Sequence, residues 1–216
     1  MPLSFRLCTL MILTIAVVAG WAAGTVSGQT VRGTVDSTAS IIHYPGTAPL
    51  HDWTGTSRRV DGRVVLVPNR PDSSRAVIRV PVASFDSGND RRDRKMREVT
   101  EVAQYPIVEF RTTALQPVTW GRASEGHAGR WKITGTLAFH GRTDTVKTTA
   151  DVRITDEQVR VRAQFPIRLS RFEVERPSLL WASIDDTIRI DARIVGTGGP
   201  ASVGECPGDP QASGSP

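Results

Sequence analysis

The stretch Gly129–Gly141, GRWKITGTLAFHG, carries the pattern that decides the fold of this chain. Large apolar side chains occupy alternate positions at Trp131, Ile133, Leu137 and Phe139, and lysine and threonine lie between them. Successive side chains of a β-strand point to opposite faces of the sheet. The stretch therefore predicts a strand with one buried face and one face in water.

The same alternation continues toward the C-terminus in TVKTTADVRI (145–154), QVRVRAQFPI (158–167) and DTIRIDARIV (186–195). Earlier segments that are rich in Val, Ile, Thr and aromatic residues lie near 34–44, 51–60, 63–69, 75–82 and 107–115. Turn signals separate the segments: Pro45-Gly46, Asp61-Gly62, Pro68 to Pro71, Gly141 and Asp156-Glu157. Eight or more strands with short connections and one apolar face predict a closed antiparallel barrel or a sandwich.

One helix is expected among the strands. Asn89 or Asp90 can cap its start, and Tyr105-Pro106 ends it. Its apolar residues fall at helical spacing: Met96, Val99 and Ala103. We predict a helix from about Asp90 to Ala103 that docks on the barrel through Met96 and Val99.

The other side of this helix carries five cations, Arg91, Arg92, Arg94, Lys95 and Arg97. A solvated helical face is the ordinary explanation, and contact with an anionic head group or membrane surface is the alternative. Single-strand nucleic-acid binding calls for aromatic side chains among the cations. None lies between Arg91 and Arg97, so nucleic acid is not expected as a partner.

The N-terminal segment 1–28 has the order of a secretory signal peptide. A basic Met1–Arg6 region precedes the apolar run Leu7–Gly20, and small residues allow cleavage after Gly24 or Gly28. An uncleaved anchor is the alternative. We expect the mature protein to be periplasmic or secreted.

The cysteines and the C-terminal segment bear on the extent of the folded domain. Cleavage removes Cys8, so the mature chain keeps Cys206 and cannot form an internal disulfide. Residues 196–216 are rich in Gly, Pro and Ser and are predicted to be a disordered tail. One domain, residues 29–195, remains. The net charge of +5 favours anionic partners without requiring them.

Catalytic and metal-binding motifs are missing from the sequence. The four histidines, His43, His51, His127 and His140, show no ligand spacing for a metal. Asp185-Asp186 would point to opposite faces at a strand entrance, which favours a turn or pairing role over acid–base chemistry. There is no GxSxG, phosphate-binding glycine loop or CxxC. We therefore expect no catalytic residues and no metal.

Five segments in this order resemble the YceI-like family of exported proteins: LHDWTGTSRRVDGRVVL (50–66), VPVASFDSGNDRRDRKMRE (80–98), YPIVEF (105–110), WKITGTLAFHGRTDTV (131–146) and FPIRLSRFEVERPSLLWASIDDTIRIDARI (165–194). The resemblance covers about residues 32–195. It implies an all-β fold, an eight-stranded antiparallel lipocalin-like barrel with one inserted α-helix. It also implies an interior that binds a polyisoprenoid, such as an isoprenoid quinone or a polyprenyl phosphate.

The family's serine–aspartate turn and arginine–aspartate helix match Ser84, Asp86, Gly88, Arg92 and Asp93. Two stretches depart from its pattern. Lys95-Met96 and the following EVTEVAQ replace a histidine–leucine pair and a phenylalanine-rich stretch, and Glu173 follows Phe172 where a glycine is common. Both changes bear on which ligand is bound.

Under the leading hypothesis the protein sequesters or carries the lipid. The candidate lining residues are Trp53, Phe85, Phe110, Trp131, Phe139, Phe165, Phe172 and Leu180, and the candidate head-group cations are Arg91, Arg92 and Arg171. For each aromatic, plain filling of the barrel is the competing interpretation. Monomer and homodimer both remain open.

Two alternatives stand beside lipid carriage. An envelope enzyme or enzyme accessory would need titratable groups that converge at the barrel mouth, and the candidates are His43, His51, Asp86 and Asp93. A structural envelope module with no bound lipid is the other. A lipid that co-purifies with the protein would favour carriage.

Overall fold

A computed structural model describes residues 30–46, 53–67, 70–176 and 185–198, and the backbone of the short strands β10 (Ser178–Leu179) and β11 (Ala182–Ser183). Several residues and segments discussed above lie outside this part of the chain: the segment 1–28, Cys8, His51, Leu180, Cys206 and the tail beyond residue 198.

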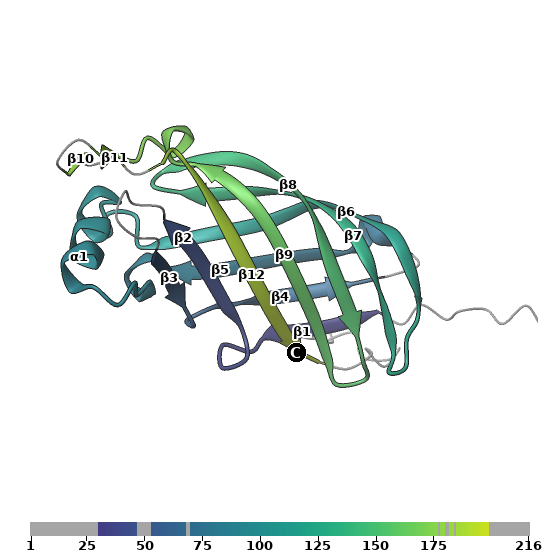
Figure 1. Ribbon diagram of the computed structural model, residues 1–216. Coiled ribbons are helices and arrows are strands. Elements are labelled where there is room, and N and C mark those ends of the chain that lie inside the picture. The colour runs from purple at the N-terminus through teal and green to yellow at the C-terminus, as the bar shows by residue number, and fades with distance from the viewer. Residues whose placement is uncertain are drawn as a thin grey trace, which may run out of the picture.

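Most of the described chain forms one closed antiparallel sheet (Figure 1). Its strands are β1 (Val31–Val35), β2 (Ile41–Gly46), β3 (Trp53–Ser57), β4 (Asp61–Leu66), β5 (Arg75–Pro81), β6 (Ile107–Arg122), β7 (His127–Phe139), β8 (Arg142–Ile154), β9 (Gln158–Arg168) and β12 (Thr187–Thr197). The order around the sheet is β1-β4-β5-β6-β7-β8-β9-β12, and β1 pairs with β12 to close the ring. This confirms the predicted eight-stranded barrel over the alternative of a sandwich.

Two of the eight positions are each shared by two short strands. Both β1 and β2 pair with β12, β1 through Val35 and Gly196 and β2 through Ile42 and Ala192. Between them the chain turns at Asp36, whose Oδ1 accepts the backbone N–H of Thr38 at 2.8 Å. The next position in the ring is shared by β3 and β4, because β3 pairs with β2 and β4 pairs with β1. The predicted strand at 34–44 is therefore broken in the middle.

Two predicted turns lie inside strands instead. Pro45-Gly46 is the end of β2, and Asp61-Gly62 is the start of β4. Gly62 has φ +152, and a Cβ there would lie 2.1 Å from the carbonyl oxygen of Val77 on β5. The glycine thus lets two strands approach closely rather than reversing the chain. The predicted turns at Gly141 and at Asp156-Glu157 are confirmed.

The helix α1 (Asp90–Val99) lies at one end of the barrel (Figure 1). The side chain of Asn89 accepts the N–H of Arg92, as the predicted cap requires. The prediction that the helix reaches Ala103 was wrong by one turn. Glu101 adopts a left-handed conformation, and the N–H groups of Glu101 and Val102 bond back to the carbonyls of Glu98 and Arg97. This Schellman arrangement ends the helix before its apolar spacing does.

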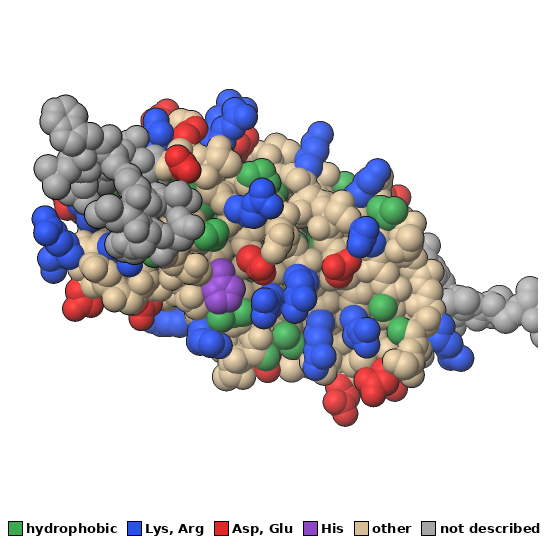
Figure 2. Space-filling view, in the orientation of Figure 1, with side chains coloured by type: hydrophobic (Ala, Val, Ile, Leu, Met, Phe, Trp, Pro, Cys, Tyr) green, Lys and Arg blue, Asp and Glu red, His purple; other side chains and the backbone are tan. Residues whose placement is uncertain are grey.

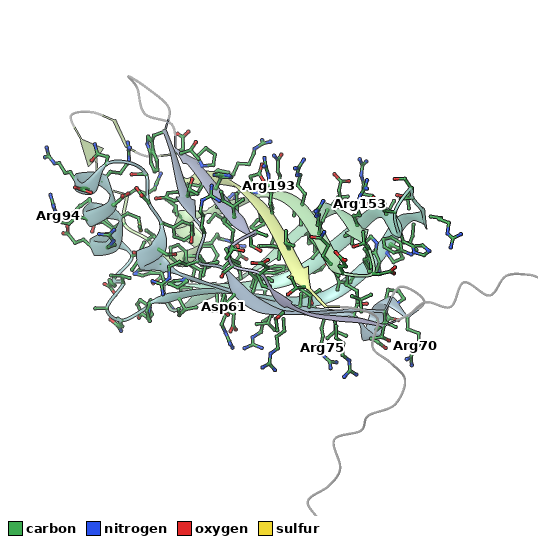
Figure 3. The ribbon with its side chains drawn as sticks, turned by 90° about the horizontal axis from the view of Figure 1, so that it is seen from below. Asp61, Arg70, Arg75, Arg94, Arg153 and Arg193 are labelled. Carbon is green, nitrogen blue, oxygen red and sulfur yellow. The ribbon has the colours of Figure 1, made fainter. Side chains whose placement is uncertain are left out.

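Three short 3-10 helices complete the described part of the fold; the one at Pro71–Ser73 lies at the end of the barrel opposite α1, as the positions of Arg70 and Arg94 in Figure 3 show. The 3-10 helices are Pro71–Ser73, Val82–Ser84 and Leu169–Phe172. We refer to the last one as η3; it connects β9 to the β10–β11 pair at the α1 end (Figure 1). The strand β12 continues to Thr197, two residues past the predicted end of the domain. Among the described residues, no helix is long and apolar enough to cross a membrane.

Charged side chains cover the outside of the barrel. Arg75, Arg153 and Arg193 point away from it (Figure 3), and Lys and Arg lie among Asp and Glu over the surface in Figure 2. The apolar side chains of the same strands point inward, as the alternation around Trp131 predicts. Trp131 is 1% exposed and belongs to a core cluster with Val64, Leu115 and Val152.

Candidate ligand-binding site

A cavity of about 1000 Å³ occupies the interior of the barrel. Side chains from every strand of the closed ring except β1 line it, and α1 and the segment after η3 complete the wall. Aliphatic residues make up much of the lining, including Ile78, Val152, Val161, Ile188, Ile190 and Ile194. The volume lies at the upper end of the roughly 300–1,000 Å³ that small-molecule sites span.

Large side chains in the wall lie next to small ones on neighbouring strands. Trp131 on β7 is in register with Ala150 on β8, and Ala150 is in register with Ala163 on β9. On the other side, Phe110 of β6 lies over Gly135 of β7, where a Cβ would come within 2.4 Å of the phenyl ring. This complementarity gives each ring a place without closing the interior, because the small neighbours supply the room.

Two aromatic rings face each other inside the barrel. Phe110 of β6 and Phe165 of β9 stack with 6.4 Å between ring centroids, although β7 and β8 separate their strands in the sheet. Both residues line the cavity. The pair therefore narrows the interior between the deep end around Trp131 and the end covered by α1.

At the α1 end, three aromatic side chains form a cluster that we call the mouth cluster: Tyr44, Trp53 and Phe85. Tyr44 packs edge-on against Trp53 and Phe85, at 5.5 and 5.0 Å between ring centroids. The guanidinium of Arg92 lies 4.3 Å above the Trp53 ring, a cation–π contact. The cluster joins β2, β3 and the loop before α1 at the edge of the cavity, and Arg92 connects it to the helix.

The hydroxyl of Tyr44 is a buried polar atom, and no described residue pairs with it. Burial raises the pKa of Tyr44 well above its usual range, and the nearby carboxylate of Asp93 raises it further. The hydroxyl therefore stays protonated. A neutral hydroxyl in the wall of a cavity can donate to, or accept from, a polar group of a ligand.

Cations surround the same end of the cavity. Arg91, Arg94, Lys95 and Arg176 contribute to the lining, with the carboxylates of Glu98 and Glu175. Lys95 is paired with Glu98 at 2.9 Å, whereas Arg91 and Arg94 have no acidic partner within 4 Å among the described residues. The mouth thus combines a positive rim with an apolar interior.

The structure brings most of the predicted site residues to this cavity. Its wall contains Trp53, Phe85, Phe110, Trp131, Phe139, Phe165, Arg91 and Arg92. Phe172 is 1% exposed and packs against Phe139 at 5.5 Å behind the wall. Arg171 lies outside the cavity and pairs with Asp144 at 3.5 Å. Leu180 falls outside the described residues.

Sequence reasoning missed several wall residues that carry polar groups, among them Tyr44 and Arg176. Tyr44 follows Ile42 at the period of a strand, and this alternation could have identified it. Nothing in the local sequence marks Arg176, because its place depends on how the chain leaves η3 for the β10–β11 pair.

The described groups named for an enzyme each have a local hydrogen-bond partner. Nδ1 of His43 lies 3.0 Å from Oγ1 of Thr56, and Asp86 accepts the N–H of Gly88. Asp93 is 4% exposed and accepts the N–H and the hydroxyl of Ser87, so it shapes the loop before α1. His51 falls outside the described residues. Within the described chain, no three His, Cys, Asp or Glu side chains come together to hold a metal.

Asp186 has the turn role that its position predicted. Its carboxylate accepts the N–H and the hydroxyl of Ser170 at 2.8 and 2.7 Å, and its carbonyl accepts the N–H of Leu169. The hydroxyl of Ser170, and then its N–H, lower the pKa of Asp186 from 3.8. Asp186 thereby attaches η3 to the start of β12.

A model of the YceI-like domain matches residues 25–196, which is most of the chain. No curated protein matches the chain.

Several solved structures share the fold. BcnA of Burkholderia cenocepacia is 21% identical with a TM-score of 0.64, covering 74% of this chain and 98% of its own. A polyisoprenoid binding domain from Saccharophagus degradans, implicated in plant cell wall breakdown, is 16% identical with a TM-score of 0.62, covering 76% and 97%. A YceI protein of Campylobacter jejuni is 16% identical with a TM-score of 0.54, covering 66% and 83%.

Proposed function

The chain belongs to the YceI-like family, and from that premise we propose that it is an exported protein that holds one long isoprenoid lipid inside its barrel. In this role the protein carries or sequesters the lipid and performs no chemistry on it. The lipid is a quinone or a polyprenyl phosphate, with its chain in the interior and its polar head at the α1 end.

The observation that supports this proposal most strongly is the apolar cavity of about 1000 Å³ in a closed barrel. A water molecule in a cavity needs two to four polar partners, and the aliphatic wall offers few. Burial of apolar surface on binding stabilises a complex by roughly 25 cal/mol for each Å² that is removed from water. A slender apolar chain therefore occupies the cavity more favourably than water does.

The class of lipid draws support from the solved structures. The Saccharophagus degradans domain is described as binding polyisoprenoids, and its likeness to this chain at 16% identity concerns the fold. A branched isoprenoid chain suits a wall of aromatic rings and aliphatic side chains in which Trp131 packs beside Ala150 and Phe110 lies over Gly135.

The mouth supports the orientation of the ligand. The hydroxyl of Tyr44 offers a hydrogen bond, and Arg91 and Arg94 offer positive charge. A quinone carbonyl needs the hydrogen bond alone, whereas a phosphate gains charge-assisted hydrogen bonds as well. We place the head group at this end for that reason.

Export is part of the proposal and rests on the order of basic, apolar and small residues in the segment 1–28. A lipid carrier outside the cytoplasm would shield an insoluble chain from water between membranes.

The direct test is organic extraction of the purified protein followed by mass spectrometry. We expect an isoprenoid lipid in about equimolar amount. Delipidated protein should then bind geranylgeraniol, with a change in tryptophan emission, because Trp53 and Trp131 line the cavity. Extraction that yields no lipid, together with no uptake of geranylgeraniol, would overturn the proposal and favour an envelope enzyme accessory or a structural module.

A matched pair of variants separates interior binding from surface binding. Ala192 lines the cavity, and Ala192→Phe should weaken the binding of geranylgeraniol by blocking the interior. Ala138 lies between Leu137 and Phe139 on β7, both of which line the cavity, so Ala138 is on the outward side. Ala138→Phe should bind as the wild type does. Equal weakening by both variants would contradict binding inside the barrel.

A further inference from the structure

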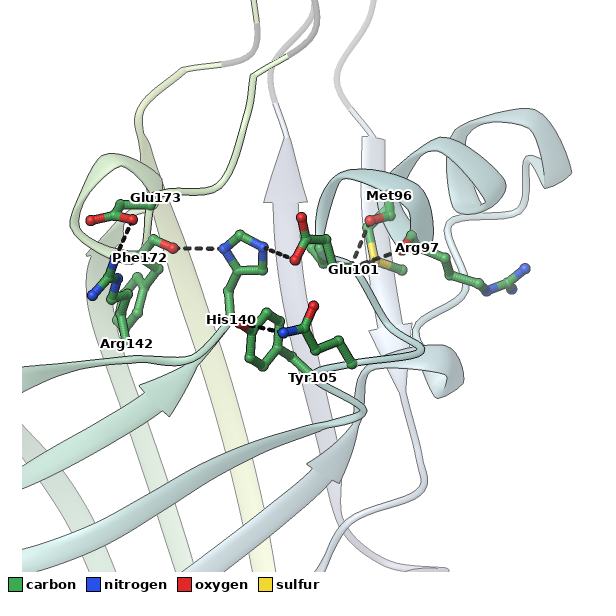
Figure 4. Close-up of polar contacts among 10 residues, drawn as sticks. Met96, Arg97, Glu101, Tyr105, His140, Arg142, Phe172 and Glu173 are labelled. Atoms are coloured by element: carbon green, nitrogen blue, oxygen red, sulfur yellow. Dashed lines mark hydrogen bonds and ion pairs between the residues drawn. The ribbon is translucent and has the colours of Figure 1, made fainter.

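Three residues other than glycine adopt left-handed backbone conformations in the described chain: Glu101, His140 and Glu173, at φ 46, 49 and 54. They lie far apart in sequence, yet Figure 4 shows them side by side around the imidazole of His140. Such conformations are costly for side chains with a Cβ and persist where surrounding structure holds them. Their convergence marks a junction that the fold maintains against local strain.

The junction joins three segments through His140. Its Nδ1 lies 2.8 Å from the carbonyl oxygen of Phe172 at the end of η3. Its Nε2 lies 3.7 Å from Oε2 of Glu101, just after α1 (Figure 4). The imidazole itself follows β7, and its side chain is 11% exposed.

The first contact determines the tautomer. A carbonyl oxygen can accept a hydrogen bond but cannot donate one, so Nδ1 carries the proton. In the neutral imidazole, Nε2 then has a lone pair that faces the Glu101 carboxylate, and two acceptors oppose each other. No described residue gives Nε2 a hydrogen bond. A second proton on the ring converts this opposition into an ion pair.

Both partners of His140 border the cavity. Val99 and Thr100, directly before Glu101, line it at the end of α1. Leu169 and Val174, on either side of Phe172, line it at η3. His140 therefore bridges the two segments that bound the mouth.

We propose that His140 and Glu101 form a proton-operated latch that holds the end of α1 against η3 and controls exchange of the ligand. The role in ligand exchange rests on the proposed function. With His140 doubly protonated the latch is closed and the ligand exchanges slowly. With His140 neutral the latch loosens and exchange is faster.

Other charged groups around the imidazole do not replace this pair. Arg142, two residues along the chain, is bound to Glu173 at 2.6 Å, so their charges offset each other. On η3, Arg171 is paired with Asp144. On the α1 side, the Tyr105 ring packs edge-on against His140 at 5.1 Å. Arg97 lies in the last turn of α1, and its carbonyl faces the Thr100 hydroxyl.

The sign of the pH dependence follows from the pairing. The closed latch favours the protonated imidazole, so its stabilisation is present at low pH and disappears as pH rises through the range where histidine loses its proton, about pH 5 to 8.

The latch can be tested without any ligand by hydrogen exchange of residues 100–105 and 170–174. Glu101→Gln places an amide N–H against the lone pair of Nε2, which closes the latch at every pH. At pH 8 we expect these segments to exchange about two- to fivefold faster in wild type than in Glu101→Gln, the range of a partly exposed ion pair. At pH 5.5 the two proteins should agree. Comparison at equal pH cancels the chemical exchange rate.

Two further variants complete the test. Changing Arg142 and Glu173 together to glutamine removes a nearby ion pair whose charges offset each other, leaves the His140–Glu101 contact in place, and should keep the pH response of the wild type. His140→Asn keeps a residue that tolerates the left-handed conformation and removes the titrating group, so exchange should be fast at both pH values. Equal exchange in wild type and Glu101→Gln at pH 8, or a pH response that survives in Glu101→Gln, would overturn the latch.

The second readout is the release rate of geranylgeraniol at pH 5.5 and 8. We expect release from the wild type to accelerate about two- to fivefold at pH 8, and release from Glu101→Gln to stay slow. A protein that shows the latch by hydrogen exchange but binds no geranylgeraniol would refute the proposed function and leave the latch itself in place. Binding with a pH-independent release rate would refute the latch as a control of exchange.

Discussion

Arg92 is engaged in the structure around the mouth rather than available to a ligand. Its Nε donates to the hydroxyl of Ser87 at 2.8 Å, and its Nη2 donates to the carbonyl of Ser87 at 3.1 Å. Its guanidinium also covers Trp53. The hydroxyl of Ser87 in turn donates to Asp93 at 2.6 Å. Arg92 therefore holds the loop before α1 onto the mouth cluster.

Arg92→Gln should lower the free energy of unfolding by about 1–2 kcal/mol, because a cation–π contact and hydrogen bonds from a charged group are lost. Arg91→Gln is the matched control, and we expect its effect on stability to stay within about 0.5 kcal/mol. Denaturant unfolding of the two variants measures the difference. Equal destabilisation would mean that Arg91 also supports the fold.

The Arg91→Gln variant also distinguishes a phosphate ligand from an uncharged one. Arg91→Gln should weaken the binding of geranylgeranyl phosphate by roughly 0.5–1 kcal/mol and leave that of geranylgeraniol unchanged, because Arg91 is exposed and only the phosphate is charged. Titration followed by tryptophan emission gives both affinities. A loss of affinity for the alcohol as large as that for the phosphate would place Arg91 on the chain rather than on the head group.

For single residues, the sequence predicts which side chains face inward but not which polar groups are available to a ligand. Alternation along β7 places Trp131 and Phe139 on the wall, as expected. The engagement of Arg92 depends on the turn at Ser87, and the burial of Asp93 depends on the same turn. Contacts of that kind link a helix to a loop and a strand, and no period in the sequence encodes them.

Among the elements, the helix α1 can be tested for the support that its apolar side gives to the barrel. Val99 lines the cavity and packs against the buried cluster that contains Leu137 and Phe172. Val99→Asp should lower the free energy of unfolding by about 1–3 kcal/mol, since it places an unpaired charge against apolar side chains. Arg94→Glu, at an exposed position, should change it by less than about 0.5 kcal/mol. Similar midpoints of thermal unfolding for the two variants would contradict this orientation of the helix.

The junction of η3 with β12 should give the protein part of its acid sensitivity. Hydrogen bonds from Ser170 lower the pKa of Asp186 below its usual 3.8. A carboxylate with a lowered pKa stabilises the folded state above its unfolded value, and the stabilisation disappears as pH falls through the folded value. The midpoint of thermal unfolding should therefore decline below about pH 4 in the wild type. Asp186→Asn should flatten this part of the curve, and an unchanged decline would assign it to other carboxylates.

The sequence predicted the elements better than their ends. The strands β7, β8, β9 and β12 follow clear alternation and match the prediction closely, whereas the two-residue strands β10 and β11 were not predicted. The predicted strand at 34–44 is broken by the Asp36 turn, and the predicted turn at Gly62 lies inside β4, where the glycine lets β4 approach β5. Local composition does not distinguish a glycine of that kind from a turn. The helix ends early because Glu101 takes a conformation that glycine usually takes.

For the whole molecule, export remains a prediction of the segment 1–28. We expect the mature protein to begin near Thr25 or Gln29 and to fractionate outside the cytoplasm. N-terminal sequencing of the processed protein checks this directly. A sequence that begins at Met1 or Pro2 would contradict cleavage and favour an uncleaved anchor.

The way in which the barrel closes has a practical consequence. The seam between β1 and β12 pairs Thr34 with Thr197, and β12 runs from η3 beside the mouth to the opposite end of the barrel (Figure 1). Val31 and Thr197 therefore both lie at the end away from α1. A fluorescent reporter or a surface tether that is fused at either side would leave the opening unobstructed. Molecules immobilised in this way would all present the same end to an applied vesicle, which makes the barrel suitable for an oriented lipid-capture sensor.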